Sequence, residues 1–114
     1  MKALTVKQIQ TESPQQTKML FWFLFVRTRG AANRIKIVSL LRDNPSNKNQ
    51  LANELGVDYK GIGLHLTTLE KNNIVNKIGS KYGATYFVSA FFEKGEAVFD
   101  EIVTKLMKRG GSVE

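Results

Sequence analysis

Two helix-start signals separated by a tight turn lie near the middle of the chain. In the first, Asn47 can cap a helix, and Gln50, three residues later, can bond back to the backbone of the cap. In the second, Asp58 can cap a further helix, two residues after Gly56. Glycine readily adopts the left-handed conformation that ends a helix. The sequence therefore predicts a helix-turn-helix over residues 47–72.

A β-hairpin is predicted directly after this pair of helices. Residues 74–78 (IVNKI) and 84–88 (ATYFV) carry the β-branched and aromatic side chains typical of strands. Between them, residues 79–83 (GSKYG) have the composition of a turn. We therefore expect a hairpin, or wing, over residues 74–88, which completes the element order of a winged helix-turn-helix.

The apolar octet MLFWFLFV at residues 19–26 dominates the N-terminal part of the chain, and a helix start at residues 13–14 precedes it. A helix that is apolar on every side is normally buried on every side, and a domain this small is expected to cover it only in part. We therefore expect part of the octet to contact a second copy of the chain. The alternative is a ligand pocket lined by Phe21, Trp22 and Phe25.

A final helix is predicted over residues 90–109, with Ser89 as its cap. Phe92, Phe99 and Leu106 recur in it at intervals of seven, a spacing that suits packing against a second copy of the helix. The first and last helices are therefore expected to form a homodimer interface. The residues predicted for this interface are Leu20, Phe21, Trp22, Phe23, Phe25, Phe92, Phe99, Ile102 and Leu106.

The expected fold class follows from this order of elements. A further helix, from about Ala32 to Arg42, fills the interval before the helix-turn-helix. The fold is predicted to be mainly α (α+β), a winged helix-turn-helix with N- and C-terminal dimerisation helices. Residues 13–114 are expected to form this single domain, and residues 1–12 an N-terminal arm.

Basic residues are unevenly distributed along the chain, whose net charge is +7. Residues 27–88 hold 10 Lys and Arg against 4 Asp and Glu, whereas residues 89–114 hold 4 against 5. A basic middle favours a polyanionic partner such as nucleic acid. The alternative is that the excess lysine only keeps the protein soluble.

The scarcity of reactive side chains argues against catalysis and metal binding. The chain has no cysteine, which excludes disulfides, thiolate metal sites and cysteine nucleophiles. Its one histidine, His65, lies at the edge of the apolar face of the second helix of the pair, where we expect a structural or phosphate-contacting role. We therefore predict no enzymatic activity, no catalytic residue, no metal and no cofactor.

The N-terminal sequence MKALTVKQIQTESP lacks the apolar core of a signal peptide. No apolar run in the sequence approaches the roughly 18 residues of a membrane span. The expectation is therefore a cytoplasmic protein without a membrane partner.

Two stretches of the helix-turn-helix carry a resemblance to a known family. The pattern NQLAxxLGVDYK at residues 49–60, followed by IxxHLxxLExxxIV at residues 62–75, resembles the ArsR-type winged helix-turn-helix regulators, particularly their archaeal branch. The resemblance covers about residues 30–89 and implies a homodimer that binds operator DNA, with repression as a common outcome. Metal-sensing members use cysteine thiolates or clusters of histidine and carboxylate. The absence of cysteine here excludes a thiolate sensor. An oxygen-rich metal site stays open as an alternative, although no D-x-D or H-x-x-E spacing points to one.

The outward side of the helix at residues 59–72 is the predicted DNA-contacting surface. Its lysines suit contacts to phosphates. Leu64 and the threonine methyl groups can touch the methyl group of thymine, whereas no Arg, Asn or Gln is present there to bind guanine or adenine. Gly61 and Gly63 weaken the helix by roughly 0.5–1 kcal/mol each, and their missing side chains would let it approach DNA closely.

Further contacts are expected from the wing tip and from Arg34 at the start of the preceding helix. The alternative for these positions is a plain solvated surface. The predicted DNA-binding residues are Arg34, Asn47, Lys48, Tyr59, Lys60, Gly61, Gly63, Leu64, Thr67, Thr68, Lys71, Lys77, Ser80, Lys81 and Tyr82.

The predicted function is sequence-specific binding of double-stranded DNA by a homodimeric transcriptional regulator, in the role of a repressor, with the helix at residues 59–72 in the major groove. Two alternatives remain open. One is an architectural protein that coats the chromosome with little sequence preference, and the other is a winged-helix module that binds other proteins. No pattern in the sequence indicates a particular operator or a small-molecule effector.

Overall fold

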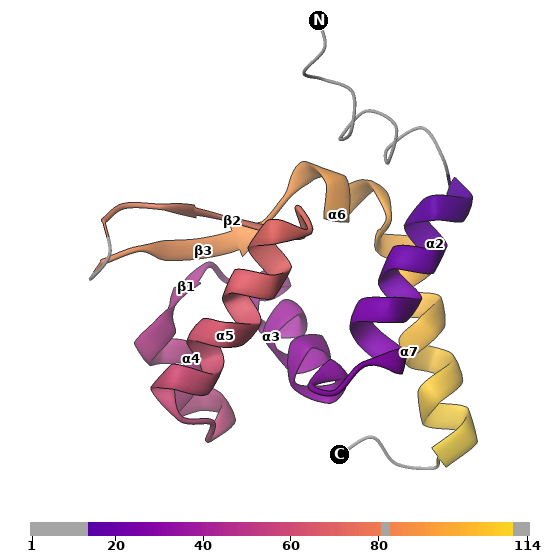
Figure 1. The fold of residues 1–114 in the computed structure, drawn as a ribbon, viewed down its shortest axis with the longest axis horizontal. Helices are drawn as coiled ribbons and strands as arrows, with labels where there is room; N and C mark the ends of the chain where they lie inside the picture. The colour runs from indigo at the N-terminus through magenta and orange to yellow at the C-terminus, as the bar shows by residue number, and fades with distance from the viewer. Residues whose placement is uncertain (1–13, 81–82, 111–114) are drawn as a thin grey trace, which may run out of the picture.

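The computed structural model describes residues 14–80 and 83–110 (Figure 1). The predicted N-terminal arm and the wing-tip residues Lys81 and Tyr82 lie outside the described residues. In chain order the elements are α2 (Pro14–Trp22), the π-helical segment η1 (Phe23–Arg27), α3 (Ala31–Asp43), β1 (Ser46–Asn47), α4 (Lys48–Leu55), α5 (Tyr59–Lys71), β2 (Val75–Ile78), β3 (Thr85–Val88), α6 (Ala90–Lys94) and α7 (Glu96–Gly110).

The predicted helix-turn-helix is confirmed as α4 and α5, and its capping residues act as expected. The Asn47 side chain accepts a hydrogen bond from the Gln50 N–H, and Gln50 Oε1 accepts one from the Asn47 N–H, both at 2.8 Å. Gly56 has a left-handed backbone, with φ 67°. Asp58 accepts a hydrogen bond from the Gly61 N–H at 3.2 Å. These caps fix where each helix begins and ends, which sets the direction of α5.

The predicted hairpin is also confirmed, with one added strand. β2 and β3 pair antiparallel in a register that places Val75 opposite Val88 and Ile78 opposite Thr85. The short β1 pairs with the other edge of β3, so the strand order is β1-β3-β2. A strand of two residues carries no periodicity, which is why β1 was not predicted. It joins the start of α4 to the wing, and the hairpin extends beyond the helices (Figure 1).

The core lies between the helix-turn-helix and the helices α2 and α7, which run side by side (Figure 1). The apolar side of α5 enters this core as predicted, because Ile62, Leu66 and Leu69 are buried. Burial of each such side chain stabilises the fold by about 1.5–3 kcal/mol. The mainly helical winged fold expected from the sequence is therefore the fold of the chain.

The structure corrects part of the predicted dimer interface. The rings of Phe21, Phe25, Phe92 and Phe99 are buried inside one chain, where neighbouring ring centroids lie 5.0–5.8 Å apart. Ile102 is buried in the same core. Contacts between aromatic rings at such distances stabilise a core. These side chains are therefore unavailable to a second copy of the chain, and Phe21 and Phe25 do not line an open ligand pocket.

The rest of the predicted interface is accessible in the single chain. Phe23, on η1, is 52% exposed. Leu20, Trp22 and Leu106 are half-buried at the edge of the core. Of the three residues spaced seven apart, Phe92 and Phe99 therefore pack within one chain. Only Leu106 extends toward the surface.

The first and last predicted helices are each interrupted. The first is α-helical to Trp22 and then becomes π-helical in η1. The last divides at Gly95 into α6 and α7. A Cβ atom on Gly95 would lie 3.1 Å from both Phe21 Cζ and Thr17 Cγ2, closer than ordinary van der Waals contact. The absence of a side chain at Gly95 therefore allows α2 to pack closely against the junction of α6 and α7.

Candidate nucleic-acid interface

Four side chains form a line along the outward side of α5. Lys60, Leu64, Thr67 and Lys71 follow one another at intervals of four, three and four residues, which places them on one helical face. All four are exposed, and Leu64 is 68% exposed. This line, the α5 stripe, lies opposite the buried face of the helix. It presents a cation at each end and apolar groups in the middle.

A further cation reaches this surface from α4. Lys48 Nζ lies 5.2 Å from the centroid of the Tyr59 ring, a distance suited to a cation–π contact. The same ammonium would lie 3.6 Å from a Cβ atom on Gly63. That distance is an ordinary van der Waals contact, so Lys48 passes close to Gly63 beside the start of α5 without requiring a glycine there.

Gly61, the first glycine of α5, has a structural role at the start of the helix. A Cβ atom on Gly61 would lie 2.8 Å from Asp58 Oδ1, closer than the two atoms can pack. The Gly61 N–H itself donates to Asp58 Oδ2. Gly61 therefore accommodates the cap that starts α5, and the structure gives a reason for this glycine that involves no ligand.

The structure corrects the prediction for Arg34. Only 5% of Arg34 is exposed. Its Nε donates to Leu24 O at 2.9 Å, and its Nη2 donates to Thr28 Oγ1. The Thr28 hydroxyl donates in turn to Phe23 O at 2.8 Å. Burial lowers the pKa of Arg34. Arg34 thus bonds to the π-helical segment and is not a surface residue that contacts phosphate.

His65, on α5, lies next to Arg34 at Gly30. A Cβ atom on Gly30 would lie 2.6 Å from His65 Cε1 and 3.0 Å from Arg34 Nη1, so both side chains pack against Gly30. The pKa of His65 is lowered, first because burial disfavours the charged imidazolium and second because the Arg34 cation is close. His65, Arg34 and Thr28 therefore connect α5 and α3 to the end of η1.

The lowered pKa of His65 predicts that the protein is less stable in mild acid. Since the unfolded chain binds a proton at a higher pH than the folded one, the free energy of unfolding falls as the pH drops through the unfolded value of about 6.5. Urea unfolding at pH 7.5 and pH 5.5 measures this change. We expect the free energy of unfolding of His65→Gln to change less with pH between 7.5 and 5.5. Most carboxyl groups titrate below this range, so they contribute little to the change. Equal slopes for the two proteins would contradict the assignment.

The remaining predicted contacts lie at the edges of this surface. Lys77 is on the wing, with its Nζ 3.8 Å from Glu70 Oε1 near the end of α5. Ser80 is exposed at the start of the wing turn. Thr68 is half-buried, and the carboxamide oxygen of Asn47 is occupied by the cap of α4. The structure therefore brings together Lys48, Tyr59, Lys60, Gly63, Leu64, Thr67 and Lys71 on one surface.

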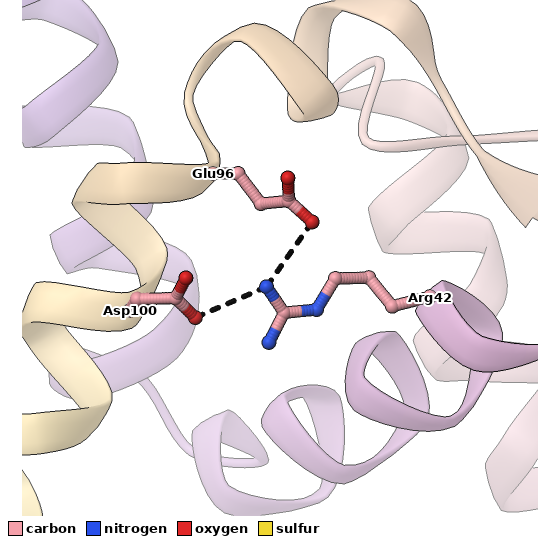
Figure 2. Close-up of polar contacts among 3 residues, drawn as sticks. All are labelled: Arg42, Glu96 and Asp100. Atoms are coloured by element: carbon pink, nitrogen blue, oxygen red, sulfur yellow. Dashed lines mark hydrogen bonds and ion pairs between the residues drawn. The ribbon is translucent and has the colours of Figure 1, made fainter.

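Arg42 is a structural residue that was not singled out from the sequence (Figure 2). Its Nη1 lies 3.1 Å from Glu96 Oε2 and 3.0 Å from Asp100 Oδ1, and its guanidinium lies 5.1 Å from the Phe99 ring centroid. Burial by itself would lower the pKa of Arg42, but the bonds to the two carboxylates outweigh it and raise the pKa. Arg42 therefore joins the end of α3 to α7. The spacing of four between Glu96 and Asp100 was the available signal.

The described residues contain neither a candidate metal site nor a helix that could span a membrane. In residues 14–80 and 83–110, no group of three His, Cys, Asp or Glu side chains is arranged to hold a metal ion. Across the same ranges, every helix is too short or too polar to span a membrane.

Comparisons with known proteins identify the type of domain. Residues 32–77, from α3 to most of β2, match the model of a family described as bacterial regulatory protein, arsR family. No curated protein sequence matches the chain significantly.

Several solved structures share the fold. Reduced HlyU from Vibrio cholerae N16961 aligns with a TM-score of 0.58 and 19% identity over 88% of this chain and 95% of its own. The PcaV transcriptional regulator from Streptomyces coelicolor gives 0.59 and 14% over 91% and 77%. ZitR from Lactococcus lactis, in complex with DNA, gives 0.55 and 16% over 93% and 77%. At these identities the comparison establishes a common winged helix-turn-helix fold.

Proposed function

We propose that this chain is a transcriptional regulator that binds double-stranded DNA as a homodimer, inserts α5 into the major groove and represses transcription. The observation that carries the proposal is the α5 stripe, in which exposed lysines flank apolar side chains on the second helix of a helix-turn-helix. The match of residues 32–77 to an arsR-family model and the DNA complex of ZitR support it. The narrower assignment to the archaeal branch rests on the pattern in residues 49–75 alone.

The proposed dimer interface consists of the apolar surface left on α2, η1 and α7. Met19 and Phe23 are exposed four residues apart, and Met107 is exposed near the end of α7. Large exposed apolar side chains on adjacent helices are typical of subunit contacts. A two-fold dimer would present two copies of α5 to DNA, with half-sites about 10 bp apart. The proposed location is the cytoplasm, where DNA is available to such a regulator.

Removing the lysines of the α5 stripe is expected to weaken DNA binding without changing sequence preference. Lys60→Ala and Lys71→Ala each remove one phosphate contact, so a plot of log affinity against log salt concentration should lose about one unit of slope per substitution. Fluorescence anisotropy titrations at several salt concentrations measure this slope. Lys105→Ala is the matched control, because Lys105 is an exposed lysine of α7 that pairs with Glu101 at 3.4 Å. An affinity that barely responds to salt would contradict the proposal.

A coating protein with little sequence preference is the second candidate function. The observation that favours it is the absence of Arg, Asn and Gln from the α5 stripe, since these residues make the common bidentate contacts to bases. Selection of binding sites from a random DNA pool separates the two functions. A shared pseudo-palindrome supports the regulator, and its absence supports the coating protein.

A further inference from the structure

Leu64 occupies an unusual position for an apolar side chain. Single exposed leucines are common on protein surfaces and need no explanation. Leu64, however, lies at the centre of the α5 stripe, 68% exposed, with a lysine one turn before it. Its neighbours on the stripe are charged or carry a methyl group. The centre of this surface is therefore apolar and the ends are cationic.

Thr67 adds a second apolar group beside Leu64. Its hydroxyl donates to Gly63 O at 3.0 Å, so the donor of this exposed side chain is used within the helix. The γ-methyl group is then the part of Thr67 that is left for an outward contact. The middle of the α5 stripe offers methyl groups and no free amide, guanidinium or carboxylate.

The α5 stripe is somewhat longer than the major groove is wide. Lys60 and Lys71 are eleven residues apart, which is about 16 Å along a helix. The major groove of B-DNA is about 12 Å wide. Lysines at the two ends can therefore reach phosphates on opposite walls of the groove while Leu64 and Thr67 face its floor.

Only one base presents an apolar group on that floor. Guanine, adenine and cytosine show hydrogen-bonding atoms in the major groove, whereas thymine also shows its C5-methyl group. We propose that Leu64 and Thr67 read thymine methyl groups, so that each half-site has A·T pairs with thymines beneath the centre of α5. This inference rests on the proposed function, since it requires α5 to lie in the major groove.

Replacing thymidine by deoxyuridine tests the inference directly. The probe is the duplex that the purified chain of residues 1–114 selects from a random pool, synthesised again with deoxyuridine in the half-sites. This change removes the methyl groups and keeps every base-pair hydrogen bond. Since burial of one such group contributes about 0.8 kcal/mol, we expect affinity to fall about four-fold for each methyl contacted. Fluorescence anisotropy at fixed salt measures it.

Two variants identify the side chain responsible. Leu64→Ala should bind the thymidine duplex more weakly and respond less to deoxyuridine than the wild-type protein does. Ile78→Ala is the matched control, because Ile78 on the wing is also 68% exposed. It should keep the full response to deoxyuridine. Circular dichroism checks that both variants are folded.

The possible failures are distinguishable. Equal affinity of the wild-type protein for both duplexes overturns methyl recognition and leaves DNA binding intact. A selected site without thymines in the half-sites, or no common site at all, also overturns it. An undiminished response in Leu64→Ala removes Leu64 from the contact. Failure to bind any duplex overturns the proposed function and this inference together.

Discussion

Gly30→Ala is expected to destabilise the fold by about 2–5 kcal/mol. Gly30 has a left-handed backbone with φ 88°, which adds about 1–2 kcal/mol for any residue with a Cβ atom. The new Cβ would also lie 2.6 Å from His65 Cε1 and 3.0 Å from Arg34 Nη1. Overpacking of this kind typically adds a further 1–3 kcal/mol. Urea unfolding at pH 7.5 measures the sum.

Gly56→Ala separates the two contributions. Gly56 also has a left-handed backbone, with φ 67°, but a Cβ there would meet no atom within 4 Å. We therefore expect a loss of only about 1–2 kcal/mol. In a His65→Ala background the loss from Gly30→Ala should approach that of Gly56→Ala, because the closest contact is gone. If Gly30→Ala and Gly56→Ala lose equal stability in the wild-type background, the packing of His65 on Gly30 is wrong.

The elements that the sequence predicted correctly are those with local causes. The box formed by Asn47 and Gln50, the left-handed Gly56 and the Asp58 cap depend on residues no more than four apart, so their pattern is visible in the chain. The apolar face of α5 has a clear helical period for the same reason. The position of the α5 stripe, opposite that face, followed from it.

The errors arose where the environment of a residue depends on how separate elements pack against one another. Arg34 reads as a surface cation, but Leu24 O and Thr28 lie close enough in the fold to bind its guanidinium. The close packing at Gly95 involves Phe21 from α2, 74 positions earlier. The apolar octet at residues 19–26 does not itself indicate which of its aromatic rings lie in the core. Hydrophobicity alone did not separate Phe21 from Phe23, although one is buried and the other is half exposed.

Phe23 is exposed whereas Phe21 is buried, which makes Phe23 the side chain to change in a test of the proposed dimer. Phe23→Asp is expected to dissociate the proposed dimer, because it places a carboxylate in the accessible apolar surface of η1. Buried aromatic side chains at interfaces commonly contribute 2 kcal/mol or more. Analytical ultracentrifugation at micromolar concentration should show a dimer for the wild-type chain and a monomer for the variant.

DNA binding should change with the dissociation. Two linked half-sites gain about 10²–10⁴ in affinity over one, so Phe23→Asp should lose about this factor on a palindromic duplex. On a duplex with one half-site its affinity should equal that of the wild-type chain, because α5 is unchanged. Ile78→Asp is the control for oligomeric state, since it adds the same charge at an exposed apolar residue of the wing.

A carboxylate introduced in the core should have a different effect on folding from one introduced at the proposed interface. Phe21→Asp buries a carboxylate among aromatic rings and is expected to unfold the chain, whereas Phe23→Asp should leave the thermal unfolding of the monomer cooperative. A Phe23→Asp protein that still sediments as a dimer would place the interface elsewhere. A wild-type chain that sediments as a monomer would remove the dimer from the proposal, and with it the expectation of a palindromic site.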